Sequence, residues 1–295
     1  MERLGGLDPA RDDRRPWLLL AILAGSLLLY VMLRSDGVWF FAQAIGFLFA
    51  TLAVYEAVHR RLVLAGLALG LAFLSRQLMI LLAPFVFVLA LRQDERLFGF
   101  DRAWLARVLK FGTPLAGAIL VYLAYNVARF GAPLETGYAH ILSDPNTYIG
   151  QRLAEAGLFS ARYVLFNAAY LFLQGFHAEF GDPLMTRLTG LDPNGASLLA
   201  ASPFLLMAFS LPRRRTMLIG LACAGLMIGV GLFYHSNGFS QYNAQRYALD
   251  WLPVLLAFLP LCLTTERLPV FRLLVTYAVG LNLATLAVLA VTKAA

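Results

Sequence analysis

Three arginines lie at the ends of apolar stretches, where a positive charge can hold an anionic group. They are Arg76, Arg129 and Arg246. None of the three stands in an open, basic loop. A cation fixed where a membrane helix meets water is well placed to bind an anionic lipid head group. These residues therefore predict the recognition of a lipid-borne anion.

The segment YNVARFGAPLETGY, residues 125–138, surrounds Arg129 with residues that bend the chain. The Gly-Ala-Pro triplet at 131–133 ends a helix just after the arginine, and a later glycine permits a further tight bend. We expect these bends to hold Arg129, Glu135 and Tyr138 near the membrane surface. The alternative is a capped helix end whose arginine reaches the interface and whose glutamate is solvated.

The segment HSNGFSQYNAQRYALDWLP, residues 235–253, is rich in hydrogen-bonding side chains. It contains aromatic residues suited to stacking on sugar rings, and it ends near Arg246, Tyr247 and Asp250. An aqueous loop of this composition over an apolar bundle suits a substrate with a hydroxyl-rich end and an apolar tail. The alternative is an aromatic belt with a polar connection between two membrane helices.

Neither a metal site nor a disulfide is indicated by the spacing of the cysteines and histidines. Cys223 and Cys262 both lie within apolar runs, and the 4 histidines are dispersed along the chain. We therefore predict two buried thiols, no metal site and no cofactor. A metal held in part by a lipid substrate is the one alternative that these residues leave open.

The elements that position these residues are predicted to be membrane helices. The chain is 60% hydrophobic and 14% charged, with a mean hydropathy of +0.71. Soluble domains are about 45–50% apolar. The length of 295 residues allows about eight crossings of about 20 residues each, with one substantial loop. We predict an all-α, polytopic transmembrane bundle that forms a single domain over residues 1–295.

The basic residues predict the orientation of this bundle. Of the 24 lysines and arginines, 16 fall in one set of loops and 8 in the other. The richer set is expected to face the cytoplasm. This distribution also accounts for the net charge of +7, so we predict no nucleic-acid partner. We therefore expect residues 1–16 to form a cytoplasmic tail and residues 128–195 to be extracytoplasmic. The prediction as a whole is a multi-pass protein of a bacterial-type plasma (inner) membrane.

The apolar stretch at 62–91 needs division, because as one helix it would be about 45 Å long. Basic segments flank it on both sides, which requires an even number of crossings. We divide it at Ser75-Arg76-Gln77 and predict that Arg76 faces outward. The alternative is one tilted helix with a buried arginine. Assigned along the chain, the predicted spans come to nine, against the roughly eight that the length suggests. They are 17–33, 38–58, 62–74, 78–91, 111–127, 196–211, 217–234, 251–263 and 273–291.

The apolar run at 163–176 is interpreted as an outer interfacial helix. If it crossed the membrane, the basic triplet at 213–215 would move to the outer side, against the charge rule. The extracytoplasmic segment 128–195 therefore contains this helix.

Four segments resemble, in the same order, parts of the multi-spanning GT-C type glycosyltransferases. This group includes the relatives of protein O-mannosyltransferases and of lipid A aminoarabinose transferases. The resemblance runs from about residue 38 to about residue 253. The segments are GLALGLAFLSR (66–76), YNVARFGAPLETGY (125–138), GASLLAASPFLL (195–206) and QRYALDWLP (245–253).

The resemblance implies transfer of a sugar from a polyprenyl-phosphate donor to a glycan, lipid or protein acceptor, on the outer side of the membrane. A guanidinium near the leaving phosphate stabilises the transition state more than the ground state. Arg76 and Arg246 are the first candidates for this role and Arg129 the third. Membrane lipids are the remaining partners, and a carboxylate is needed to deprotonate the acceptor. The substrate-binding candidates are Arg76, Arg246, Tyr247, Arg129, Glu135 and Tyr138.

The sequence departs from the family at its N-terminal end. The family carries its catalytic Asp in a sizeable first outer loop, whereas the corresponding loop here comprises residues 34–37. We therefore expect the chain to be the C-terminal part of a longer transferase and leave the catalytic base unassigned. Glu135, Asp182 and Asp250 are the first carboxylates to test. The competing hypothesis is a truncated or inactive homologue that only binds or transports a lipid-linked sugar.

Overall fold

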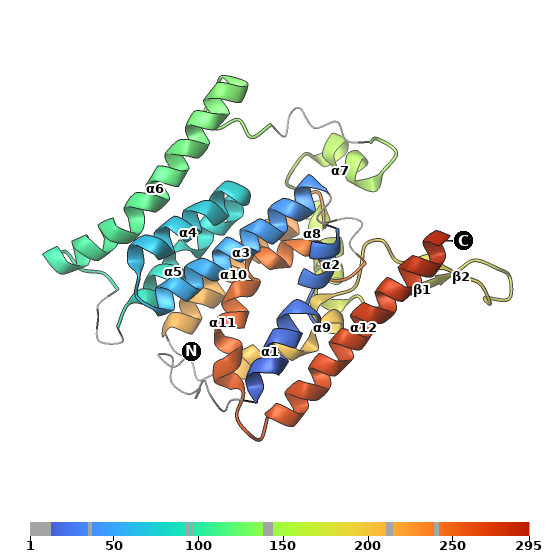
Figure 1. Ribbon diagram of the computed structural model, residues 1–295. Coiled ribbons are helices and arrows are strands. Elements are labelled where there is room, and N and C mark those ends of the chain that lie inside the picture. The colour runs from blue at the N-terminus through green and yellow to red at the C-terminus, as the bar shows by residue number, and fades with distance from the viewer. Residues whose placement is uncertain are drawn as a thin grey trace. The chain divides into compact units, whose positions relative to one another are not determined.

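The computed structural model describes residues 13–34, 37–92, 95, 97–137, 144–210, 215–238 and 242–294. The described part of the chain is mostly helical, as predicted, but it is not all-α, because it also carries one short two-stranded antiparallel sheet (Figure 1). It forms two compact units. Unit 1 comprises residues 1–44, 159–212 and 228–295, and unit 2 comprises residues 45–158 and 213–227.

Unit 1 contains α1 (Arg14–Leu23), α2 (Leu28–Leu33), η4 (Ala161–Tyr163), α8 (Val164–Ala168), the π-helix η5 (Ala169–Leu173), β1 (Ala178–Phe180), β2 (Leu188–Leu191), α9 (Leu198–Ala201), η6 (Pro203–Ser210), η7 (Arg246–Asp250), α11 (Leu252–Cys262) and α12 (Leu268–Ala294). Unit 2 contains α4 (Leu62–Ser75), η2 (Gln77–Leu82), α5 (Ala83–Ala90), α6 (Arg102–Phe130) and α7 (Tyr148–Ala156). Two helices, α3 (Val38–Val58) and α10 (Arg215–Phe233), begin in one unit and end in the other. The elements η2, η4, η6 and η7 are 3-10 helices.

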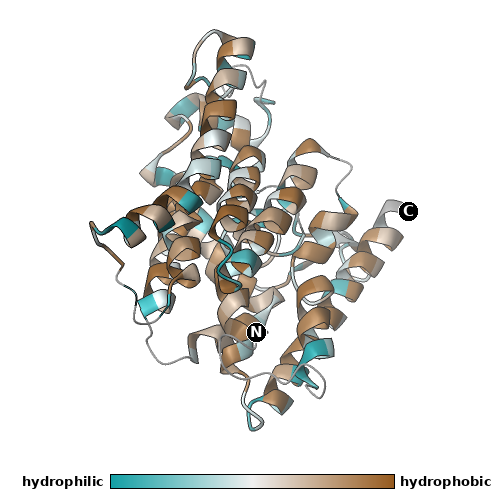
Figure 2. Cartoon of the chain, turned by 60° about the vertical axis from the view of Figure 1, so that its left-hand side comes forward, coloured by the Kyte–Doolittle hydropathy of each residue, from teal (hydrophilic) through white to brown (hydrophobic). Residues whose placement is uncertain are grey.

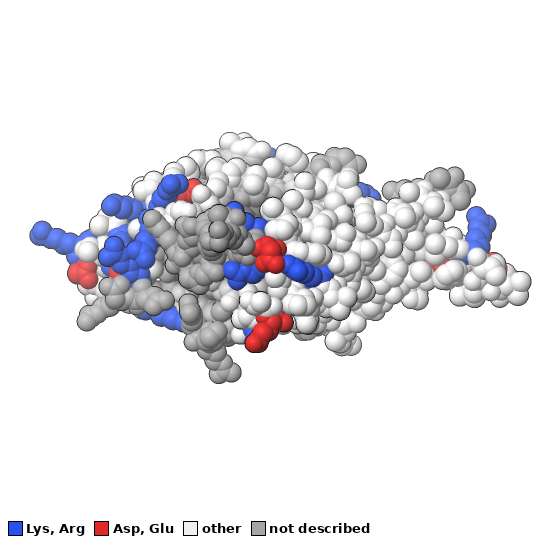
Figure 3. All heavy atoms as spheres, turned by 60° about the horizontal axis from the view of Figure 1, so that its bottom comes forward, with Lys and Arg blue, Asp and Glu red and all other residues white. Residues whose placement is uncertain are grey.

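Four helices in the described part of the chain are long and apolar enough to cross a membrane. They are α3, α6, α10 and residues 268–292 of α12. Most residues of these helices are hydrophobic, as the colouring by hydropathy shows (Figure 2). Residues other than Lys, Arg, Asp and Glu make up most of the described surface that is visible in Figure 3. The remaining apolar helices are shorter than a full crossing. These helices are compatible with a membrane protein by their length and composition, and the number of about eight spans stays a prediction.

The predicted division at Arg76 is confirmed. Helix α4 ends at Ser75, and Arg76 adopts an extended conformation with φ −148° and ψ 102° before η2 begins. One continuous helix over this stretch, the alternative interpretation, is therefore wrong. Helix η2 and α5 then fold back along α4 within unit 2.

Helices α4 and α6 pack closely and run parallel. A Cβ atom on Gly66 would come within 2.0 Å of the Phe111 carbonyl oxygen, and one on Gly70 within 2.8 Å of the Ala118 Cβ. Small residues four apart let two apolar helices approach at backbone distance. Further along, the rings of Phe73 and Tyr122 meet at 5.2 Å. The C-terminal ends of the two helices therefore lie at the same end of the pair.

Helix α6 is longer than its apolar part. It begins at Arg102 because the Asp101 carboxylate accepts a hydrogen bond of 2.7 Å from the Trp104 backbone N–H, which caps the helix. Residues 102–110, which precede the predicted span at 111–127, are thus helical as well. The helix ends at Gly131, whose φ of +74° suits a glycine.

The first predicted span is interrupted in its middle. Between α1 and α2 the backbone leaves the helix, and side chains from other helices bind the freed carbonyl groups. Asn282 of α12 donates to the carbonyls of Ala24 at 2.6 Å and Ser26 at 3.3 Å, and Ser202 donates to that of Gly25 at 2.9 Å. Within a membrane, a break in a helix needs such partners. Ser202 itself stands between α9 and η6, which divide the predicted span 196–211.

The predicted outer helix at 163–176 is present as a helical run over 161–173. Its buried Asn167 donates hydrogen bonds to the carbonyls of Leu232 at 2.9 Å and Tyr234 at 2.8 Å. These groups belong to the C-terminal end of α10, where carbonyls have no partner within the helix. The middle of the run therefore lies against a helix end.

Candidate functional site

The segment between α10 and α11 folds into the interior of unit 1. Apart from its tyrosines, its described polar residues are each more than nine-tenths buried, namely His235, Ser236, Asn237, Asn243, Gln245, Arg246 and Asp250. The prediction of an aqueous loop is thus wrong for these residues, because the protein itself covers them. Asn243 contacts α12, and Arg246 and Asp250 contact α3. The remaining residues of the segment, 239–241, lie outside the described ranges.

Arg246 is the charged group around which this site is built. Its side chain is only 8% exposed, and its guanidinium carbon lies 5.0 Å from the centre of the Phe40 ring and 4.8 Å from that of Tyr247. The guanidinium also donates to the Tyr247 hydroxyl at 3.3 Å, and this hydroxyl donates to Ser236 at 3.3 Å. Aromatic faces stabilise a cation and keep water from it. The structure therefore brings together the two predicted residues Arg246 and Tyr247.

A buried carboxylate stands at the other end of the same short helix. Asp250 is fully buried and ends η7, the helix that Arg246 begins. Its carboxylate accepts a hydrogen bond from the side-chain amide of Gln43 on α3. A buried carboxylate requires such donors. Gln43 was not predicted as a site residue, although a single amide in the otherwise apolar first half of α3 was a signal for it.

Two amide groups of this cluster keep unused hydrogen-bonding capacity. Among the described residues, neither the Gln43 Oε1 acceptor nor the Gln245 Nε2 donor has a hydrogen-bond partner. Both side chains are more than nine-tenths buried. Buried polar atoms nearly always have a partner in native proteins. Together they provide one acceptor and one donor that suit a hydroxyl-bearing ligand.

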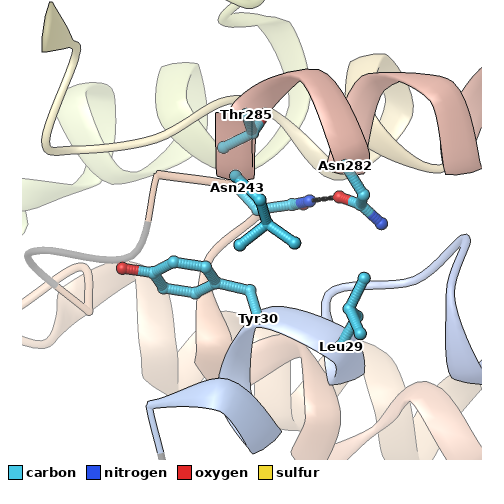
Figure 4. A pocket seen from close by; sticks show the side chains of 6 residues that line it. Leu29, Tyr30, Asn243, Asn282 and Thr285 are labelled. Carbon is cyan, nitrogen blue, oxygen red and sulfur yellow. Dashed lines mark hydrogen bonds between the residues drawn. The ribbon is translucent and has the colours of Figure 1, made fainter. Parts of the chain in front are cut away.

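A small cleft with a volume of about 10 Å³ lies beside this cluster (Figure 4). Asn243 donates to Asn282 across it, and Tyr30 forms the opposite wall. The Tyr30 ring meets the Phe40 ring at 6.3 Å, and Phe40 in turn contacts Arg246. The cleft has room for about one water molecule and is far smaller than the 300–1,000 Å³ typical of ligand pockets. Its lining residues are Leu29, Tyr30, Asn243, Asn282, Thr285 and Leu286.

Arg76 lies in unit 2, in the extended link after α4. A Cβ atom on Gly46 of α3 would come within 2.9 Å of the Arg76 Cγ and 3.0 Å of the Met79 Cε. The aliphatic part of Arg76 therefore packs on the backbone of α3. Because α4 and α6 run parallel, Arg76 and Arg129 lie toward the same end of this helix pair.

The segment around Arg129 has the bends that its sequence predicts. Arg129 is exposed, and its guanidinium carbon lies 4.7 Å from the centre of the Phe130 ring. Glu135 accepts a hydrogen bond of 2.7 Å from the Gly137 backbone N–H, and Asn126 donates to the Pro133 carbonyl at 3.0 Å. These contacts are those of a capped helix end. The predicted residue Tyr138 lies outside the described ranges.

Asp182, the other carboxylate singled out for testing, fastens a turn between β1 and β2. It accepts hydrogen bonds of 2.7 Å from the Arg187 backbone N–H and 2.7 Å from the Thr186 hydroxyl. These hydrogen bonds, that of Arg187 first, lower the pKa of Asp182 below its ordinary value. The carboxylate is engaged in local structure.

Within the described ranges, no three His, Cys, Asp or Glu side chains are grouped so that they can hold a metal ion. Both cysteines are buried.

Compared with protein-family models, with curated proteins and with solved structures, the chain matches none of them.

Proposed function

We propose that the protein is a membrane glycosyltransferase that moves a sugar from a polyprenyl-phosphate donor to an acceptor on the outer face of a bacterial-type plasma membrane. The observation that carries the proposal is the buried Arg246, which contacts the rings of Phe40 and Tyr247 and begins the helix that Asp250 ends. The resemblance of QRYALDWLP to the GT-C type transferases falls on this helix.

The environment of Arg246 suits a phosphate leaving group. As the bond between sugar and oxygen breaks, the polyprenyl phosphate gains negative charge, which a fixed guanidinium stabilises. Burial strengthens this interaction because little water screens it. The Gln43 Oε1 atom supplies an acceptor and the Gln245 Nε2 atom a donor for sugar hydroxyls, since neither has a partner among the described residues. In this proposal Asp250 takes the proton of the acceptor hydroxyl.

The arrangement of helices within each unit supports the proposed orientation. In unit 1, Arg272 forms an ion pair with Asp13, and Asn282 donates a hydrogen bond to the Ala24 carbonyl. Helices α1 and α12 therefore run parallel. This is the direction expected if the N-terminus and the loop at 264–271 both lie in the cytoplasm. Arg14 donates to the Leu263 carbonyl at this same end. Helices α4 and α6 of unit 2 are likewise parallel, as the predicted outward position of Arg76 and Arg129 requires.

The second candidate function is a protein that binds or transports a lipid-linked sugar without transferring it. The observation that favours it is the complete burial of Asp250, which already accepts a hydrogen bond from Gln43. A carboxylate held in this way serves structure as well as it serves proton transfer. The two functions share the phosphate site at Arg246 and differ only in turnover.

The test measures donor binding and transfer by the purified chain in lipid vesicles. A radiolabelled polyprenyl-phosphate hexose is the donor, and a mixture of membrane-derived glycolipids is the acceptor. We expect Arg246→Ala to weaken donor binding about tenfold or more, because it removes a charge-assisted contact to phosphate. The matched control is Arg162→Ala, which removes an exposed arginine of the same unit. Equal binding by wild type and Arg246→Ala would overturn the site.

Turnover then distinguishes the two functions. The transferase is supported if the wild type transfers the sugar and Asp250→Asn abolishes transfer while it still binds the donor. Binding without transfer assigns the chain to the second function or to part of a longer transferase.

A further inference from the structure

A short hairpin in unit 1 presents an apolar tip. Strands β1 and β2 pair antiparallel, with Ala178 opposite Leu191 and an irregularity after Glu179. Strand β2 packs against α12. The turn that connects the strands, residues 181–187, reads GDPLMTR. It carries an exposed leucine and an exposed methionine, Leu184 at 82% and Met185 at 63%.

Hydrogen bonds hold this tip in shape. The Asp182 carboxylate accepts from the backbone N–H groups of Thr186 and Arg187 and from the Thr186 hydroxyl. Met185 stands at φ +55°, a conformation that a non-glycine residue adopts only where the surroundings impose it. The side chains of Leu184 and Met185 are therefore directed outward by a fixed turn. A pair of apolar side chains kept in this way is suited to insertion into an apolar phase.

The place of the hairpin within unit 1 indicates what that phase is. Figure 1 shows β1 and β2 beside the C-terminal part of α12, with their turn pointing away from the helix. Helix α12 is long and apolar enough to span a membrane, and it exposes large apolar side chains such as Leu283 at 57% and Val291 at 66%. In the proposed orientation its C-terminal end reaches the outer membrane surface. A turn that projects sideways from this end lies level with the outer leaflet.

A positive charge accompanies the apolar pair. Arg187 is exposed and follows the tip by two residues, where the turn joins β2. A long basic side chain beside an apolar insertion reaches lipid phosphates while its neighbours enter the acyl region. The tip thus combines the two features by which peripheral segments bind membranes.

We propose that the β1–β2 hairpin is a lipid anchor, in which Leu184 and Met185 insert into the outer leaflet and Arg187 binds lipid phosphate. The inference rests on the membrane orientation given under the proposed function and is independent of the donor and of transfer. The anchor holds the extracytoplasmic chain around residues 177–192 against the membrane beside α12.

The test places a spin label on the tip of the full-length protein in vesicles of phosphatidylethanolamine and phosphatidylglycerol. Leu184→Cys carries the label, and wild type treated in the same way measures labelling of the buried Cys223 and Cys262. Collision with oxygen, which concentrates in lipid, is compared with collision with a water-soluble nickel complex. Thr189→Cys on the strand behind the tip is the matched control, and Leu283→Cys on α12 reports the membrane core.

We expect the label at residue 184 to collide with oxygen more than with the nickel complex. Its preference for oxygen should be weaker than that of the label at 283 and stronger than that of the label at 189. A tip label as accessible to nickel as the label at 189, with residue 283 in lipid, would overturn the anchor and leave the proposed function standing. A label at 283 exposed to nickel would overturn the membrane placement of α12 and the anchor with it.

Discussion

The amide of Gln43, in the second turn of α3, donates a hydrogen bond to the carboxylate of Asp250, 207 positions later in the chain. Both side chains are fully buried. The bond ties α3 to the helix that begins with Arg246, whose guanidinium rests on Phe40 one turn earlier in α3. Two contacts one turn apart on the same helix thus fix both ends of η7.

Replacement of Gln43 by Leu is expected to destabilise the protein. It removes the hydrogen bond that Gln43 donates to the buried carboxylate of Asp250, at a cost of about 1–3 kcal/mol. Thermal unfolding in detergent measures the effect as a lower Tm. Gln151→Leu, which changes an exposed glutamine of α7, is the control and should leave the Tm close to that of wild type. An unchanged Tm in Gln43→Leu would show that the Asp250 carboxylate does not need this hydrogen bond.

Gly66→Ala tests the close packing of α4 on α6. Its Cβ would lie 2.0 Å from the Phe111 carbonyl oxygen, so the helices must separate. Overpacking of this kind costs about 1–3 kcal/mol. Gly117→Ala is the matched control, because its Cβ meets nothing within 4 Å and alanine favours the helix by about 1 kcal/mol. We expect opposite shifts in Tm for the two variants, and equal shifts would contradict the contact.

Arg76→Ala is expected to abolish sugar transfer while leaving expression of the protein intact. A milder variant is Gly46→Ala, whose added methyl group lies 2.9 Å from the Arg76 Cγ and displaces the side chain without removing its charge. We expect partial loss of donor binding in Gly46→Ala. Gly225→Ala on α10 is the control, since nothing lies within 4 Å of its Cβ. Full transfer by Arg76→Ala would show that this arginine takes no part in transfer.

Tyr170 makes stability depend on pH in strongly alkaline solution. Burial, followed by its 2.7 Å hydrogen bond to Asp192, raises the pKa of Tyr170 from 10.0 to about 12. Since the folded protein then holds the phenolic proton more tightly than the unfolded chain, the contribution is complete below pH 10 and is lost as pH rises toward 12. Unfolding measured across this window should show a steeper decline for wild type than for Tyr170→Phe. Parallel declines would contradict the raised pKa.

The sequence by itself determined the apolar helices and several of their ends. Hydropathy predicted α3 over its full range, and the polar triplet Ser75-Arg76-Gln77 predicted the division between α4 and η2. The glycine at 131 predicted the end of α6. These features follow from local chemistry, because solvation of apolar runs and backbone preferences of glycine and proline depend on adjacent residues.

Only the tertiary structure decided which polar groups inside the bundle meet. The break between α1 and α2 depends on Asn282 and Ser202, which bind its carbonyls from distant parts of the chain. The segment around Arg246 is buried because α3 supplies a ring and an amide to receive it. Hydropathy describes each residue's preference for water or lipid, and it contains no term for a partner two hundred positions away. Hydrogen bonds over such separations are selected by how the helices pack, which is why the candidate site became visible only in the fold.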